Sequence, residues 1–156
     1  MIIEDSRQKA EKHAQKHKYF KSEELSIMRS KLPYGDYALP PAVSVDTKQN
    51  VQEIAQNMCG SAREKARFRE ECALAKSADA RLIILIEDGR IRGVPELFGK
   101  TIRLATGQII KGDQLARAMG VMRERYGVEF EFCKPEDAGK RIVELLMGKE
   151  AKNDSI

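Results

Sequence analysis

The sequence predicts an α/β domain in which helices flank one mixed central sheet, and its apolar patterns carry this prediction. Residues 82–86 form a continuous apolar run with the length of a buried strand. Val128, Phe130 and Phe132 alternate with glutamates, as expected for a half-exposed strand. Other stretches, before the first of these two strands and between them, have apolar residues at helical spacing. A chain of 156 residues, 42% of them hydrophobic, is long enough to bury one globular core.

The first third of the chain is expected to supply strands and one helix. Residues 1–4 predict a first strand, residues 6–18 a helix without Pro or Gly, and residues 25–29 a second strand. Residues 35–39 and 42–48 then flank the breaker pair Pro40-Pro41, which predicts a hairpin with the prolines at its tip.

The remaining elements are predicted from periodicity and capping signals. Helices are expected over 51–60, from a capping box at Ser61 to about residue 76, over 115–126, and from Pro135 to Gly148. Strands are expected over 81–86 and 128–132. Residues 88–112 show no clear period, which is uncommon in a compact domain unless the segment binds something or is disordered. We therefore expect one domain over 1–148 and a disordered tail over 149–156.

Composition narrows the class of protein. No stretch approaches the roughly 18 apolar residues that a membrane helix needs, and the N-terminus lacks the pattern of a secretory signal. The three cysteines are far apart and form neither a disulfide framework nor a zinc pair, so a reducing cytoplasm is the expected location. The net charge of +4 is modest, but basic residues gather in the segment 88–112, namely Arg90, Arg92, Lys100, Arg103 and Lys111. A solvated surface is the alternative interpretation of that run.

The predicted hairpin brings two carboxylates and one ammonium together. Residues two apart on a strand point to the same face, so Ser44, Asp46 and Lys48 share one face. With the prolines at the tip, Asp36 falls nearly opposite Asp46, and Cβ atoms of cross-strand neighbours are about 4.5–5.5 Å apart. Two carboxylates at that separation repel each other unless a positive group lies between them. Mg²⁺, which takes oxygen ligands and is often held by one or two carboxylates plus a substrate phosphate, is the natural candidate.

This arrangement suits phosphodiester hydrolysis. A metal ion polarises the phosphoryl oxygen and lowers the pKa of a bound water, and Lys48 is placed to hold or deprotonate that water, or to offset transition-state charge. The bare D/E-x-K pattern has little specificity, since residues 150–152 also match it. In the alternative interpretation, Asp36 is a turn residue and Lys48 a solvated strand end.

The order of the motifs resembles the XPF-type nuclease domain of the PD-(D/E)xK superfamily, over roughly residues 1–148. The matching blocks are Ile-Ile-Glu-Asp-Ser-Arg-Gln (2–8), Leu-Pro-Tyr-Gly-Asp-Tyr (32–37), Val-Asp-Thr-Lys (45–48) and the strand ending at Glu87. The family shows D-x-R-E, G-D-Y, E-R-K-x-x-x-D and a strand ending in V-E. The C-terminal part is similar to short, single-domain members from bacteria and their phages. The resemblance implies a restriction-endonuclease-like fold and activity on DNA, in repair or recombination.

Carried over residue by residue, the resemblance implies metal binding at Asp36 and Asp46, with Asp5, and catalytic roles for Lys48 and Arg7. It also implies Mg²⁺ or Mn²⁺ as the cofactor. Three positions depart from the family pattern. Asp46 stands in place of a glutamate, Gln8 replaces the Glu of D-x-R-E, and Gln52 stands where the last Asp is expected, although Glu53 is adjacent.

The sequence thus leads to one first hypothesis and two alternatives. The first is a metal-dependent endonuclease that hydrolyses DNA phosphodiesters, at branched or partly single-stranded DNA, with the basic segment 88–112 contacting phosphates. A catalytically silent relative that binds DNA or a partner protein is the runner-up. The third is a subunit that a partner must complete; a homodimer is also compatible with the sequence, whereas a membrane partner is not expected.

Overall fold

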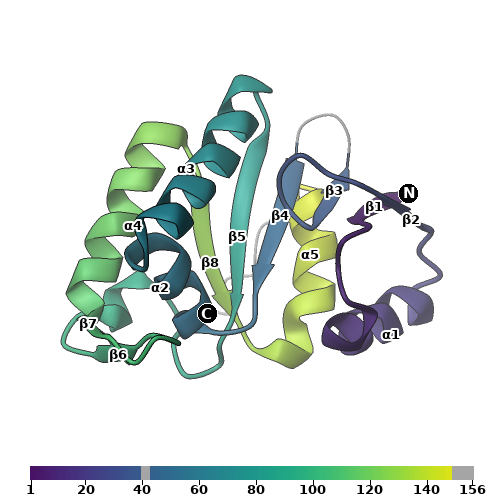
Figure 1. Cartoon of the computed structure of the whole chain (residues 1–156). Coiled ribbons are helices and arrows are strands. Elements are labelled where there is room, and N and C mark those ends of the chain that lie inside the picture. Colours follow the sequence, from purple (N-terminus) through teal and green to yellow (C-terminus); the bar gives the residue numbers. More distant parts are fainter. Residues whose placement is uncertain (40–42, 149–156) are drawn as a thin grey trace, which may run out of the picture.

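The computed structural model describes residues 1–39 and 43–148. They form three layers, with the central sheet between two layers of helices (Figure 1). The sheet has six strands in the order β2-β1-β3-β4-β5-β8. Their bounds are β1 Ile2–Asp5, β2 Ile27–Ser30, β3 Tyr37–Leu39, β4 Val43–Lys48, β5 Arg81–Glu87 and β8 Glu129–Cys133. The predicted tip at Pro40-Pro41 and the tail over 149–156 lie outside the described residues.

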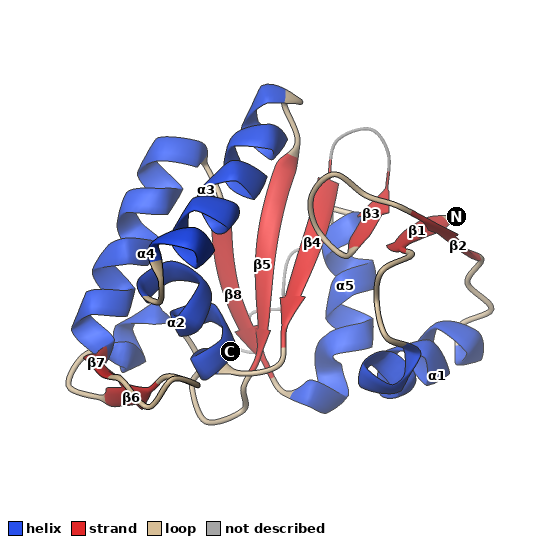
Figure 2. Ribbon diagram, viewed as in Figure 1, coloured by secondary structure: helices blue, strands red, loops and turns tan. Residues whose placement is uncertain are grey.

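The sheet is mixed, as predicted. β1 and β2, β4 and β5, and β5 and β8 pair in parallel, whereas β3 is antiparallel to both of its neighbours, β1 and β4. Helices cover both faces (Figure 2). Within the part of the chain that the structure describes, the α-helices are α1 Ala14–Ser22, α2 Val51–Cys59, α3 Ala62–Ser77, α4 Gly112–Tyr126 and α5 Ala138–Leu146. Among the described residues, no helix is both long and apolar enough to cross a membrane.

β5 divides the hydrophobic core into two halves. Its alternate residues Leu82, Ile84 and Ile86 pack with α2, α3 and α4, while Ile83 and Leu85 pack with α1 and α5. Both faces of this strand are therefore buried, which is why its sequence is a continuous apolar run rather than an alternating one. The strand prediction for residues 81–86 is confirmed.

The predicted helix over 6–18 is wrong in its bounds. A 3₁₀ turn, η1 Ala10–His13, precedes α1, which continues to Ser22. Residues 6–9 are held in a turn instead: the Gln8 amide donates to the Asp5 carbonyl (3.1 Å), and Arg29 Nη2 donates to the Gln8 carbonyl (2.7 Å). The local turn and the tertiary hydrogen bond from Arg29 override the helix preference of these residues.

The aperiodic segment 88–112 is ordered by short elements rather than being without structure. It contains a 3₁₀ turn, η2 Val94–Leu97, and a separate antiparallel hairpin of β6 Thr101–Arg103 and β7 Ile109–Lys111. Leu97, Ile102 and Ile110 are buried in the core half that α2, α3 and α4 cover. Strands of three residues contribute a single inward side chain each, which is too few to produce a detectable period.

Candidate active site

The hairpin of β3 and β4 sets the two predicted carboxylates side by side. Tyr37 pairs with Val45 and Ala38 with Ser44. Just before this register the Asp36 amide donates to the Val45 carbonyl (2.7 Å), and the Asp36 and Asp46 side chains line the same two hollows. Gly35 makes the approach possible, since its φ is +72° and a Cβ there would lie 2.0 Å from Ser44 Oγ. Only glycine adopts this conformation without strain and leaves room for the neighbouring strand. The convergence predicted from period-two alternation is therefore present.

Asp36 is anchored to the opposite strand. Its Oδ2 accepts hydrogen bonds from the Thr47 amide (2.7 Å) and the Thr47 hydroxyl (2.8 Å). Burial raises the pKa of Asp36 well above its usual value, and the charge of Asp46 raises it further, against the effect of Thr47 and Lys48. Both hydrogen bonds end on Oδ2, so Oδ1 carries neither of them.

Asp46 and Lys48 form an ion pair on the same face of β4. Their Oδ2 and Nζ atoms lie 2.9 Å apart, and both side chains are largely buried, at 8% and 12% exposure. Burial lowers the pKa of Lys48, but the charge and hydrogen bond of Asp46 outweigh burial, so the pKa is raised overall. Lys48 is therefore an ammonium at neutral pH in this arrangement.

Asp5 and Arg7 stand at the end of β1 and hold the chain that leads into the hairpin. Arg7 Nε lies 3.0 Å from Asp5 Oδ2, Asp5 Oδ1 accepts from the Leu32 amide (3.1 Å), and Arg7 Nη2 donates to the Leu32 carbonyl (2.6 Å). The Asp5 side chain is 7% exposed, whereas that of Arg7 is 58% exposed. Asp5 is thus occupied by Arg7, while Arg7 remains open to a ligand.

These residues open onto two hollows, of about 290 and 490 Å³. Asp5, Arg7, Asp36 and Asp46 line both of them, and Lys48 lines the smaller one. All five catalytic and metal-binding residues predicted from the sequence are therefore gathered at one place in the fold. Their roles remain predictions.

Two further side chains in these hollows are not among the predicted site residues. Glu71 of α3 lines the larger hollow, and its carboxylate accepts a hydrogen bond from the Gly35 amide (2.9 Å). Burial and then the charge of Asp46 raise the pKa of Glu71 to about 7. A signal did exist: Phe68, Glu71, Cys72 and Ala75 follow the i, i+3, i+4, i+7 pattern, so an acid interrupts the apolar face of this helix.

His13 is the second of these residues. It lines the smaller hollow and is mostly buried; its Nδ1 lies 3.4 Å from the Tyr37 hydroxyl. Burial, followed by the charge of Lys16, lowers the pKa of His13 to about 4, so it is neutral at pH 7. Gln8, at one of the three departures from the family pattern, also lines this hollow, and its Oε1 and Nε2 are buried without a hydrogen-bond partner among the described residues.

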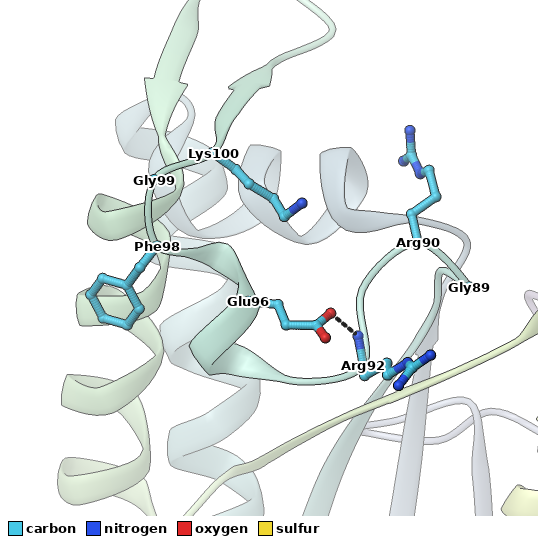
Figure 3. A pocket seen from close by; sticks show the side chains of 7 residues that line it. All are labelled: Gly89, Arg90, Arg92, Glu96, Phe98, Gly99 and Lys100. Carbon is cyan, nitrogen blue, oxygen red and sulfur yellow. Dashed lines mark hydrogen bonds between the residues drawn. The ribbon is translucent and has the colours of Figure 1, made fainter.

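The predicted DNA-contacting residues separate into two groups. Arg90, Arg92 and Lys100 line another hollow, of about 590 Å³ (Figure 3). Arg103 and Lys111 lie instead on the β6–β7 hairpin, exposed on its outer face. Arg90 is itself paired with Asp88, and its Nη2 also reaches Gln52 Oε1 at 3.2 Å.

The donor set fits a hard divalent ion bound mainly by water and substrate. Within the described residues, no three His, Cys, Asp or Glu side chains converge as a metal cluster. Asp36 and Asp46 nevertheless supply two adjacent carboxylates, and apart from its ion pair with Lys48, the buried Asp46 Oδ2 has no hydrogen-bond partner among these residues. One or two carboxylates plus waters and phosphate oxygens are the usual surroundings of Mg²⁺.

Comparison with known proteins finds this fold in solved structures. XPF from Aeropyrum pernix, and the same protein in a structure described as a complex with DNA, match with a TM-score of 0.64 and 17% sequence identity. The matches cover 93% and 94% of this chain, which spans 62% of the length of each XPF chain. No family model and no curated protein matches the sequence. The predicted mixed α/β architecture and its likeness to the XPF nuclease fold are confirmed.

Proposed function

We propose that this protein is a Mg²⁺- or Mn²⁺-dependent endonuclease that hydrolyses phosphodiester bonds of branched or partly single-stranded DNA. The observation that carries the proposal is the convergence of Asp36, Asp46 and Lys48 at one hollow, on a fold that XPF shares. The second XPF structure contains DNA, which supports DNA as the substrate class.

The chain's own residues have distinct tasks in this proposal. Asp36 and Asp46 would hold the cation, which supplies Lewis-acid polarisation of the phosphate and acidifies a water. Lys48, kept protonated by Asp46, offsets negative charge that develops on the phosphate in the transition state. Arg7, held by Asp5 and open to solvent, is placed to orient a phosphate oxygen. Asp5 remains a proposed ligand, on condition that it leaves Arg7.

The test compares cleavage with metal binding. Labelled flap, fork and linear duplex DNA are incubated with the purified protein, with and without Mg²⁺ or Mn²⁺, alongside Asp46→Asn and Lys48→Ala. We expect metal-dependent cleavage that both substitutions abolish. Mn²⁺ binding, followed by calorimetry, is expected to weaken in Asp46→Asn and to persist in Lys48→Ala, since only the first variant loses a ligand.

A matched control uses the second D/E-x-K match in the chain. Lys152→Ala removes the lysine of residues 150–152 and is expected to leave cleavage unchanged. Equal loss in Lys48→Ala and Lys152→Ala, or cleavage that persists in Asp46→Asn, would refute the assignment of the site.

A catalytically silent DNA- or partner-binding relative is the second candidate. The departures from the family pattern at Gln8 and Gln52 and the Asp5–Arg7 pairing favour it. DNA that is retained without a cut product, equally in wild type and both variants, would support this candidate. Cleavage that begins only after a second protein is added would indicate the partner-dependent form.

A further inference from the structure

The aromatic side chain of Phe98 is largely exposed to solvent. It is 53% exposed, directly after η2. Phe98 has φ −62° and ψ 136°, and Gly99 follows with φ +79°, so residues 97–100 form a type II turn. The second position of such a turn accepts most residues and favours proline, so turn geometry does not account for a phenylalanine.

The turn holds the ring in a fixed place. The Lys100 amide donates to the Leu97 carbonyl (3.2 Å), the Gly99 amide donates to Asp113 Oδ1 (2.9 Å), and the Gly112 amide donates to the Lys100 carbonyl (2.7 Å). Leu97 is fully buried beneath the turn. The exposed ring is therefore presented on an anchored loop rather than on a loose one.

Basic side chains line the hollow next to this turn. Arg90, Arg92 and Lys100 line the adjoining hollow, against Glu96, whose Oε2 accepts from the Arg92 amide at 2.7 Å. Figure 3 shows Lys100 pointing into the hollow, while the Phe98 ring projects from the outer side of the same loop. An exposed apolar side chain alone needs no explanation. An exposed aromatic ring beside a basic hollow matches the arrangement by which proteins bind single-stranded nucleic acid.

We propose that Phe98 stacks on an unpaired base of single-stranded DNA while Lys100 and Arg92 contact the flanking phosphates. The inference rests on the proposed function only in taking DNA as the substrate, and it assigns the single-stranded part of that DNA to this loop. Stacking is independent of sequence because every base presents a π-face. The positive charge favours a polyanion over an apolar protein partner as the occupant.

The chain contains no tryptophan, which allows a direct optical test. In Phe98→Trp, the introduced indole reports on base stacking through fluorescence quenching. Val121→Trp is the matched control, because Val121 of α4 is 51% exposed but borders a different hollow, between α3 and α4. Both variants are titrated with a short oligothymidylate and with a duplex, in EDTA so that no strand is cut.

We expect saturable quenching of Phe98→Trp by the single strand, weaker quenching by the duplex, and none in Val121→Trp. Wild type, Phe98→Tyr and Phe98→Ala are compared in the same buffer by fluorescence anisotropy of a labelled oligothymidylate. Phe98→Ala should weaken binding roughly 5- to 150-fold, while Phe98→Tyr retains it. Lys100→Ala should weaken binding and reduce its salt dependence.

The outcomes separate this inference from the proposed nuclease activity. Quenching by the single strand with no cleavage of any substrate would leave the inference standing and refute the activity. Metal-dependent cleavage with no quenching at Phe98→Trp would overturn the inference alone. Equal quenching by single strand and duplex, or none by either, would also overturn it.

Discussion

Replacement of Asp88 by asparagine should reduce stability in a way that depends on pH. Asp88 follows β5 and is 4% exposed. Its carboxylate accepts hydrogen bonds from the Val51 amide (3.1 Å), the Arg90 amide (3.1 Å) and the Arg90 guanidinium (2.9 and 2.8 Å). The carboxylate thus joins the start of α2, at Val51, to the loop of residues 88–93, whose Arg90 and Arg92 line the basic hollow.

The magnitude follows from the pKa. Hydrogen bonds from the Arg90 side chain lower the pKa of Asp88 from 3.8 to about 2, against the effect of burial. The ionised form is favoured in the folded state, so the stabilisation is present above the unfolded pKa and is lost as pH falls through the folded one. Because the Arg90 side chain is 69% exposed and solvent screens its charge, a shift of this size corresponds to about 1–2 kcal/mol at pH 7, and roughly half of that remains at pH 3.

Urea unfolding of wild type and Asp88→Asn, followed by circular dichroism at pH 7, 5 and 3, measures the difference directly. We expect the unfolding free energies of wild type and Asp88→Asn to differ by the same amount at pH 7 and 5, and by about half that amount at pH 3. Glu96→Gln, which removes another carboxylate from the same loop, should show a gap below about 1 kcal/mol, because its bond to the Arg92 amide is solvent-exposed. A gap for Asp88→Asn that does not change between pH 7 and 3 would show that the charge of Asp88 is not what stabilises the loop.

Three other substitutions probe the site and its support. Gly35→Ala should lower the unfolding free energy in urea by at least about 2 kcal/mol, since it adds the strain of a left-handed backbone to a Cβ contact of 2.0 Å. In Gly127→Ala the added Cβ has no atom within 4 Å, so this control adds backbone strain alone. Equal losses in the two variants would contradict this reasoning. Gln8→Glu should tighten Mn²⁺ binding, measured by calorimetry, roughly tenfold or more, because it adds a carboxylate to the smaller hollow. An unchanged affinity would place the cation elsewhere. Lys16→Met should lower the unfolding free energy by roughly 3–5 kcal/mol in thermal unfolding, since it leaves the buried Glu87 without its partner at 2.8 Å. The double variant with Glu87→Leu should recover most of that loss. No recovery would show that the cost comes from packing.

The carboxylate pair could be predicted from the sequence because local rules determine it. Alternation along a strand assigns Asp46 and Lys48 to one face, and the antiparallel pairing of β3 with β4 brings Asp36, which directly precedes β3, close to Asp46. Both steps need only residues within a dozen positions of one another. The same is true of α2 and α3, where the Ser61 hydroxyl accepts from the Glu64 amide as the capping box predicts.

Features that depend on distant contacts were not predictable in this way. Glu71 reaches the site because α3 packs across the sheet, and its contact with Gly35 joins positions 36 residues apart. The start of α1 was misplaced because Arg29, on another strand, holds the Gln8 carbonyl. The hairpin of β6 and β7 has strands of three residues, too short for a period, and its order comes from burial of Ile102 and Ile110 in the core.

Glu71 changes what the departure at Asp46 means. An aspartate is one methylene shorter than the glutamate of the family pattern, so its carboxylate stays nearer to β4. The chain adds a second carboxylate from α3, and the pKa of Glu71 rises to about 7 because burial and the charge of Asp46 both disfavour ionisation. The pKa of Asp36 is raised for the same two reasons, against the opposing charge of Lys48. A divalent ion between these carboxylates would favour their ionised forms, which is the physical basis for proposing a metal-dependent site although Gln8 stands where the family pattern has an acid.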